Sequence, residues 1–271
     1  MEQSKDMVRV RPTFLSTLFL LVIAGETFVL FGGIGAAYAL CLAIAALLVC
    51  SIAAKADDIG PAALLFFLLY LGPLFLFPNF VWSVPAGGFL AALLFTYLCL
   101  LPTAWLKPAL SWAKKGSLSQ ITLALVVITS LVSVVALGLW AMWADYLGLG
   151  SSMMKGMRTT PAWLMLGIYI PVFALVNAFA EEAVYRGFLQ EALKKRFPAN
   201  LPLVLTLQAS AFAAAHYRAG FPNGKLGYCM TFIYALMLGY LRERSEGMLA
   251  PFLAHVVADL MIGLLLFLLT A

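Results

Sequence analysis

The stretch AWLMLGIYIPVFALVNAFAEEAVYRGF, residues 162–188, decides how the rest of the chain is interpreted. Residues 162–180 carry no charge, and a run of about 20 such residues is long enough to span a bilayer as a helix. Glu181, Glu182 and Arg186 follow directly, among apolar and aromatic neighbours. A charge at the centre of a bilayer helix costs about 2.5–3.5 kcal/mol. We therefore expect these three groups to be paired, to line a polar cavity or to act chemically.

The composition of the whole chain predicts an integral membrane protein. Of the 271 residues, 64% are hydrophobic and 11% are charged, whereas a soluble domain carries about 25% charged residues. Apolar segments recur along the chain, separated by turn-forming Gly, Pro and Asn residues. They lie at about 13–31, 34–54, 61–78, 86–106, 119–144, 162–190, 201–217, 226–241 and 249–270.

The predicted fold class is all-α, a polytopic transmembrane bundle of eight or nine helices. Two or three residues separate the first two segments, so one of them is a candidate for a partial span. We expect one integral membrane domain in two parts: N-terminal helices without a motif over 1–160, and a core that carries the motifs over 161–271. Residues 107–118 are expected to form a short amphipathic helix on the membrane surface.

The basic residues predict how the chain is oriented. If the N-terminus lies inside and the chain crosses nine times, most of the 17 Lys and Arg residues fall on the inner side. This bias favours a cytoplasmic N-terminus under the positive-inside rule. The net charge of +5 is interpreted as this bias and not as a sign of nucleic-acid binding.

Helical spacing separates the roles of the intramembrane charges. Glu182 and Arg186 are four residues apart, so they share a helix face and are expected to neutralise each other. Glu181 is rotated by about 100° from Glu182 and has no cationic partner nearby in the sequence. We therefore expect a group on another helix to satisfy Glu181.

Both histidines of the chain lie in apolar segments and are candidates for this role. Glu181 lies 17 residues before Pro198, and His216 lies 17 residues after Ala199, so a helical hairpin brings the two to the same height. His255 precedes Asp259 by four residues, so these two share a face of the last segment.

These residue types suit the attack of water on an amide carbonyl. A carboxylate beside an imidazole can take a proton from water near neutral pH. A second imidazole, oriented by Asp259, can donate a hydrogen bond to the developing oxyanion. We therefore predict a hydrolytic site formed by Glu181, His216, His255 and Asp259.

The same residues resemble the motifs of the CAAX protease and bacteriocin-processing (CPBP, or Abi) family. EEAVYR, residues 181–186, fits the motif E-E-x-x-x-R, and FAAAH, which begins at Phe212, fits F-x-x-x-H. HVVAD, residues 255–259, fits H-x-x-x-(Asn/Asp), although Asp259 departs from the Asn of the best-known member. The order and approximate spacing also match, and the resemblance covers about 162–270.

This resemblance implies a glutamate-type intramembrane endopeptidase similar to the type II CAAX prenyl endopeptidase. It implies that Glu181 and His216 activate water, and that His255 and Asp259 form the oxyanion site. Glu182, Arg186 and Phe212 would support them. The expected partners are the lipid bilayer and a membrane-protein, prenylated-protein or peptide-precursor substrate, with no nucleic acid and no cofactor. The expected location is a bacterial inner membrane.

Three other functions stay open at this point. His216, His255 and Glu181 also match the ligand types of a zinc metalloprotease, although the chain contains no H-E-x-x-H motif. Intramembrane Glu and His also form proton relays in transporters. A family member without catalytic activity would serve as a binding or immunity protein.

Overall fold

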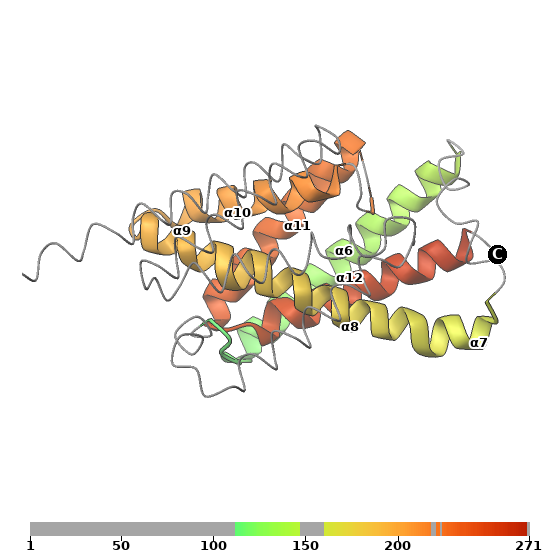
Figure 1. Cartoon of the computed structure of the whole chain (residues 1–271), viewed down its shortest axis with the longest axis horizontal. Helices are drawn as coiled ribbons and strands as arrows, with labels where there is room; N and C mark the ends of the chain where they lie inside the picture. The colour runs from blue at the N-terminus through green and yellow to red at the C-terminus, as the bar shows by residue number, and fades with distance from the viewer. Residues whose placement is uncertain (1–111, 147–159, 218–220, 223, 270–271) are drawn as a thin grey trace, which may run out of the picture.

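The computed structural model describes residues 112–146, 160–217, 221–222 and 224–269, and all regular structure in these ranges is helical. The helix α6 spans Gln120–Tyr146. A continuous rod then runs through α7 (Ala162–Leu164), the π-helix η4 (Met165–Tyr169), α8 (Ile170–Glu181), the π-helix η5 (Glu182–Leu189) and α9 (Gln190–Arg196). It is followed by α10 (Leu201–His216), α11 (Gly224–Ser245) and α12 (Leu249–Leu268). Figure 1 shows these helices.

Within the described residues, three helical stretches are long and apolar enough to cross a membrane: Gln120–Trp143, Ala162–Arg196 and Leu249–Leu268. The last five predicted segments each coincide with helices to within six residues at either end. The first four segments, the predicted count of eight or nine helices and most of 1–160 lie outside the described residues.

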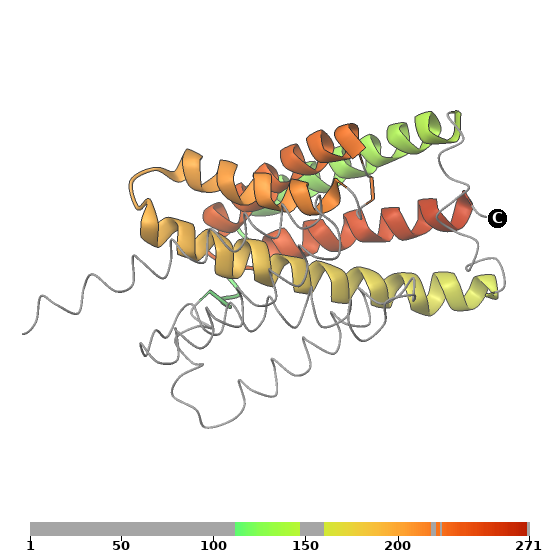
Figure 2. The ribbon, with the colours of Figure 1, turned by 45° about the horizontal axis from the view of Figure 1, so that its top comes forward.

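The helix α12 lies between α8 and α6, and α10 packs along α11. Figure 2 shows α10 running back beside the rod that ends in α9. Asn200 caps the start of α10, because its side chain accepts a hydrogen bond from the backbone of Leu203. The close approach of α8 and α12 depends on Gly263, since a Cβ atom there would lie 2.7 Å from Ile170 Cγ2.

Two π-helical segments interrupt the rod. The first, η4, ends just before Pro171, which lies in the first turn of α8 and has no backbone N–H to donate. The second, η5, begins at Glu182 and contains Arg186, and every one of its residues is buried. Single π-helical turns inside α-helices frequently occur at functional sites. The sequence predicts a kink at Pro171 in this segment, but it does not indicate π-helical geometry at either place.

The expected surface helix at 107–118 is wrong over its described part, because residues 113–118 have no regular secondary structure. The backbone of this segment instead bonds to the turn between α11 and α12. Ser117 donates to Ser245 (2.8 Å), and Met248 donates to Lys114 (2.8 Å). Gly116 makes this possible with a φ of +79°, and a Cβ atom there would lie 2.5 Å from a backbone oxygen.

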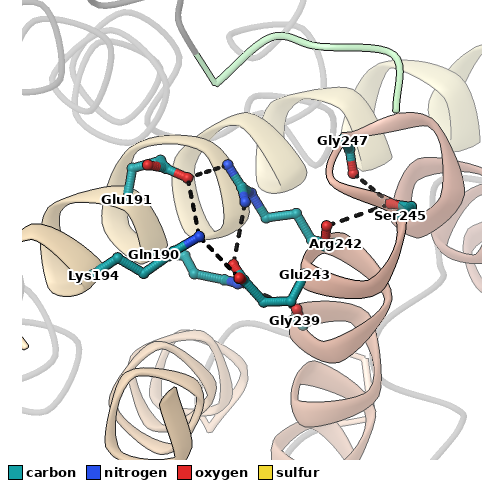
Figure 3. A network of polar contacts seen from close by, with 8 residues as sticks. All are labelled: Gln190, Glu191, Lys194, Gly239, Arg242, Glu243, Ser245 and Gly247. Carbon is teal, nitrogen blue, oxygen red and sulfur yellow. Dashed lines mark hydrogen bonds and ion pairs between the residues drawn. The ribbon is translucent and has the colours of Figure 1, made fainter. Parts of the chain in front are cut away.

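A charged network joins α9 to α11 near their ends (Figure 3). Glu243 accepts hydrogen bonds from Gln190 Nε2 at 2.8 Å and from Lys194 Nζ at 2.9 Å. Arg242 pairs with Glu191 across the same interface and with Glu243 beside it. Charges on both helices thereby hold the end of the rod against α11.

Candidate active site

Three carboxylates and one imidazole meet where the end of α8 and the first residue of η5 lie beside α12. His255 Nδ1 lies 2.7 Å from Glu182 Oε1, and His255 Nε2 lies 3.3 Å from Glu181 Oε2. A carboxylate oxygen accepts, so the Nδ1 proton is donated to Glu182. The two adjacent glutamates thus contact opposite nitrogens of one ring, which their 100° separation on the helix allows.

Glu182 and Arg186 pair as their spacing predicts, with Arg186 NH1 3.0 Å from Glu182 Oε1. The guanidinium is fully buried and lies over the Phe212 ring, 4.5 Å from its centre. A buried cation of this kind is stabilised by its carboxylate and by the ring face together. The same Glu182 oxygen therefore serves both Arg186 and His255.

His216 occupies the end of α10 next to this cluster. Its Nδ1 lies 3.0 Å from the Phe212 carbonyl oxygen, which can only accept, so Nδ1 carries the proton. In the neutral ring Nε2 then holds the lone pair. The Phe212 ring touches both imidazoles, with ring centres 4.6 Å from His216 and 5.8 Å from His255.

The expected pairing of Glu181 with His216 is not a direct contact. Glu181 contacts His255 instead, and among the described residues no ion pair joins it to His216. Residue counts predicted that Glu181 and His216 lie at the same height in the hairpin. Such counts do not determine the direction in which a side chain points. Glu181 belongs to the face of the rod that packs on α12.

Asp259 lies next to His255 but does not make the orienting hydrogen bond that its spacing suggested. Its Oδ1 is 3.8 Å from His255 Nε2, a distance typical of an ion pair and too long for a hydrogen bond. Glu182 makes that bond with the other ring nitrogen. Asp259 Oδ2 instead accepts a hydrogen bond from Asn177 Nδ2 at 3.2 Å.

Two residues near the site were missed by sequence reasoning. Asn177 is the one carboxamide in the uncharged stretch 162–180 and lies four residues before Glu181, so its position was a usable signal. Tyr234 of α11 donates its hydroxyl to the Ala254 carbonyl oxygen at 3.0 Å and packs edge-on against His255. Tyr234 had no comparable signal, because aromatic residues are common in this chain.

A cavity of about 230 Å³ opens beside the cluster, between α6, α10, α11 and α12. His216, His255 and Asp259 lie in its wall. The rest of the wall is mostly apolar and includes Leu137, Met230, Met237 and Ile262. In the part of the chain that the structure describes, no three His, Cys, Asp or Glu residues are grouped so as to hold a metal ion.

The chain was also compared with known proteins. Residues 160–261 match the model of the family described as type II CAAX prenyl endopeptidase Rce1-like, which confirms the predicted resemblance to CAAX proteases. No curated protein and no solved structure matches the chain. The matched region spans the rod, α10, α11 and most of α12, and thus contains every residue of the cluster. The family match suggests an intramembrane protease of the CAAX type in an integral membrane protein.

Proposed function

We propose that this chain is an intramembrane endopeptidase that hydrolyses a peptide bond in a membrane-associated or lipidated protein or peptide. The observation that carries the proposal is the Glu181–His255–Glu182 arrangement beside an apolar cavity. It occurs within helices that are long and apolar enough to lie in a membrane. Such a site keeps acid–base groups next to a region suited to an apolar substrate.

Glu181 and His216 are the proposed bases that activate water. The Glu181 side chain is 15% exposed, against 2% for Glu182 and 3% for Asp259, so it is the carboxylate that water reaches most easily. His216 lies in the cavity wall with Nδ1 bonded to a carbonyl, which leaves Nε2 to accept a proton. The proton taken from water would later be returned to the leaving amine.

His255, supported by Asp259, is the proposed donor to the oxyanion. Glu182 accepts the hydrogen bond from Nδ1–H, so Nε2 is the nitrogen left to donate, and it can do so when the ring is protonated. Glu182 is therefore the proposed residue that orients His255, a role that was predicted for Asp259 from its spacing. Glu182 Oε1 also pairs with Arg186. The same oxygen therefore neutralises the buried guanidinium and orients His255.

The proposed substrate class is a prenylated protein or peptide with a C-terminal CaaX sequence. The family match supports this class, and the apolar wall of the cavity suits a lipidated or apolar segment. The proposal includes the wider assignment made from the sequence: eight or nine transmembrane helices, a core over 161–271 and a bacterial inner membrane with the N-terminus in the cytoplasm.

The test is cleavage of an internally quenched peptide that carries an S-farnesyl cysteine followed by three residues, by purified protein in liposomes. We expect Glu181→Gln to lower the turnover by about 10²–10⁴-fold, the usual contribution of a general base. Glu246→Gln, a change at an exposed glutamate, is the matched control and should leave turnover unchanged. Near-normal turnover in Glu181→Gln would contradict the mechanism.

The same assay separates the alternatives that the sequence left open. Activity that is lost with a chelator and restored by Zn²⁺ would identify a metalloprotease. A wild-type protein that cleaves neither this peptide nor any membrane protein that accumulates in a Glu181→Ala strain would favour the transporter or immunity function.

A further inference from the structure

The carboxylate of Asp259 is held from two sides. Asn177 of α8 donates to Oδ2 at 3.2 Å, while Oδ1 lies 3.8 Å from His255 Nε2. Asp259 is almost fully buried, so water is largely kept from replacing either partner. The carboxamide thus determines which oxygen of Asp259 faces the imidazole.

An isolated aspartate would not keep this orientation by itself. The terminal torsion of Asp is broad, because its carboxylate rotates about an sp³–sp² bond. Glu181 and Glu182 also contact His255, so three carboxylates share one imidazole. Like charges at short range in a buried site repel one another strongly. A neutral donor on the opposite helix can hold Asp259 in place without adding charge to the cluster.

Asn177 is well placed for this task. It lies four residues before Glu181 in the rod, so both side chains belong to the face that meets α12. Its hydrogen bond therefore ties the proposed base on one helix to the proposed oxyanion site on the other. A hydrogen bond across two helices fixes their register where a small shift would separate the reacting groups.

We infer that Asn177 is a positioning residue, which orients Asp259 so that one carboxylate oxygen faces His255. The inference rests on the proposed function for its catalytic meaning. The hydrogen bond and its effect on the imidazole can be measured without any substrate. Asn177 touches neither water nor substrate in this proposal and acts only through Asp259.

The first test uses the fact that the chain contains two histidines. Protein labelled with ¹⁵N-histidine gives ring-nitrogen NMR signals from two side chains, and His216→Gln identifies those of His255. We expect Asn177→Leu to shift the His255 signals and to change their pH titration. Gln208→Leu is the matched control, because it removes another buried carboxamide that bonds across helices, to the Ala235 carbonyl. That control should leave the His255 signals in place.

The second test measures turnover of the farnesylated peptide by the same variants. We expect Asn177→Leu to lower kcat by up to about 100-fold with little change in KM, the loss typical of misplaced catalytic groups. Gln208→Leu should lower thermal stability to a similar extent but keep kcat. If Asn177→Leu does not fold, Asn177→Ala removes the same donor with a smaller change.

The outcomes keep the two proposals apart. His255 signals that are the same in Asn177→Leu, Gln208→Leu and the wild type would overturn the positioning role. If the wild type cleaves the peptide, equal kcat values in the two variants would also overturn it. If the wild type cleaves no peptide while the His255 signals respond to Asn177→Leu, the positioning role stands and the proposed function fails.

Discussion

At the scale of single residues, the site places more carboxylates than permanent cations around one buried imidazole. Glu181, Glu182 and Asp259 converge on His255, and Arg186 is the permanent cation beside them. The Coulomb energy of unpaired carboxylates at such distances is large in a buried site. Protons must therefore be shared within the cluster, and this sharing is the property that acid–base catalysis uses.

The first residue-scale prediction concerns Asp259. Asn keeps a carbonyl oxygen that accepts the hydrogen bond from Asn177, and the family motif also ends in Asn or Asp. We therefore expect Asp259→Asn to keep cleavage within about 10-fold of the wild type, whereas Asp259→Ala should lose about 100-fold or more. Single-turnover cleavage of the farnesylated peptide in one liposome preparation compares the two. Equal and severe losses would show that the negative charge is required.

The sequence predicted which charged side chains lie near one another better than it predicted their contacts. The motifs placed Glu181, Glu182, His255 and Asp259 on two apolar segments, and the structure brings these together. Residue spacing within one helix correctly paired Glu182 with Arg186, because i and i+4 positions share a face. Contacts between helices depend on rotation about the helix axis and on packing, which spacing does not determine. The bonds of Glu182 to His255 and of Asn177 to Asp259 were missed for that reason.

At the scale of the elements, the position of the site depends on how closely α8 and α12 approach. Gly263 lies one turn beyond Asp259 and faces Ile170, whose branched side chain has little freedom to move. The extent of the helices followed from hydropathy, since apolar runs of bilayer length rarely form anything else. The segment after Trp112 could not be predicted in this way, because its conformation is set by backbone bonds to the distant turn at residues 245–249.

The element-scale prediction replaces this glycine. In Gly263→Ala the new Cβ would lie 2.7 Å from Ile170 Cγ2, so the two helices must move apart. We expect a lower melting temperature and lower turnover, because His255 and Asp259 on α12 would withdraw from the rod. Overpacking of this kind typically costs about 1–3 kcal/mol.

Gly138→Ala is the matched control for this change. It adds the same methyl group to α6, another helix that packs on α12, but the nearest atom there is Met261 Cε at 3.9 Å. The control should be neutral or slightly stabilising, because Ala is preferred to Gly in a helix interior. Thermal unfolding in detergent and the cleavage assay measure both variants. Equal behaviour of the two would show that the α8–α12 contact tolerates separation.

At the scale of the whole molecule, the charged network of Figure 3 fastens the end of the rod to α11. Glu243 is its central acceptor, and it lies beyond the apolar part of α11 at 226–241. Burial alone raises the pKa of the Glu243 carboxyl. The hydrogen bonds from Lys194 and Gln190, together with the charges of Lys194 and Arg242, outweigh burial and hold this pKa below its ordinary value of 4.5. The folded protein therefore favours the ionised form.

The sign of the resulting pH dependence follows from linkage. A carboxyl group whose pKa is lower in the folded state stabilises the fold above its unfolded pKa, and this contribution is lost as the pH falls through the folded pKa. We expect the melting temperature of the wild type to fall between about pH 5 and pH 3, in part because Glu243 becomes protonated. Glu243→Gln should melt at a lower temperature than the wild type at pH 7 but lose less on acidification. Glu246→Gln, at an exposed position on the adjacent turn, should follow the wild-type curve. The measurement is the melting temperature of the three proteins from pH 7 to pH 3 in one detergent. If the melting temperatures of the wild type and Glu243→Gln fell by the same amount on acidification, this network would not couple protonation to the stability of the bundle.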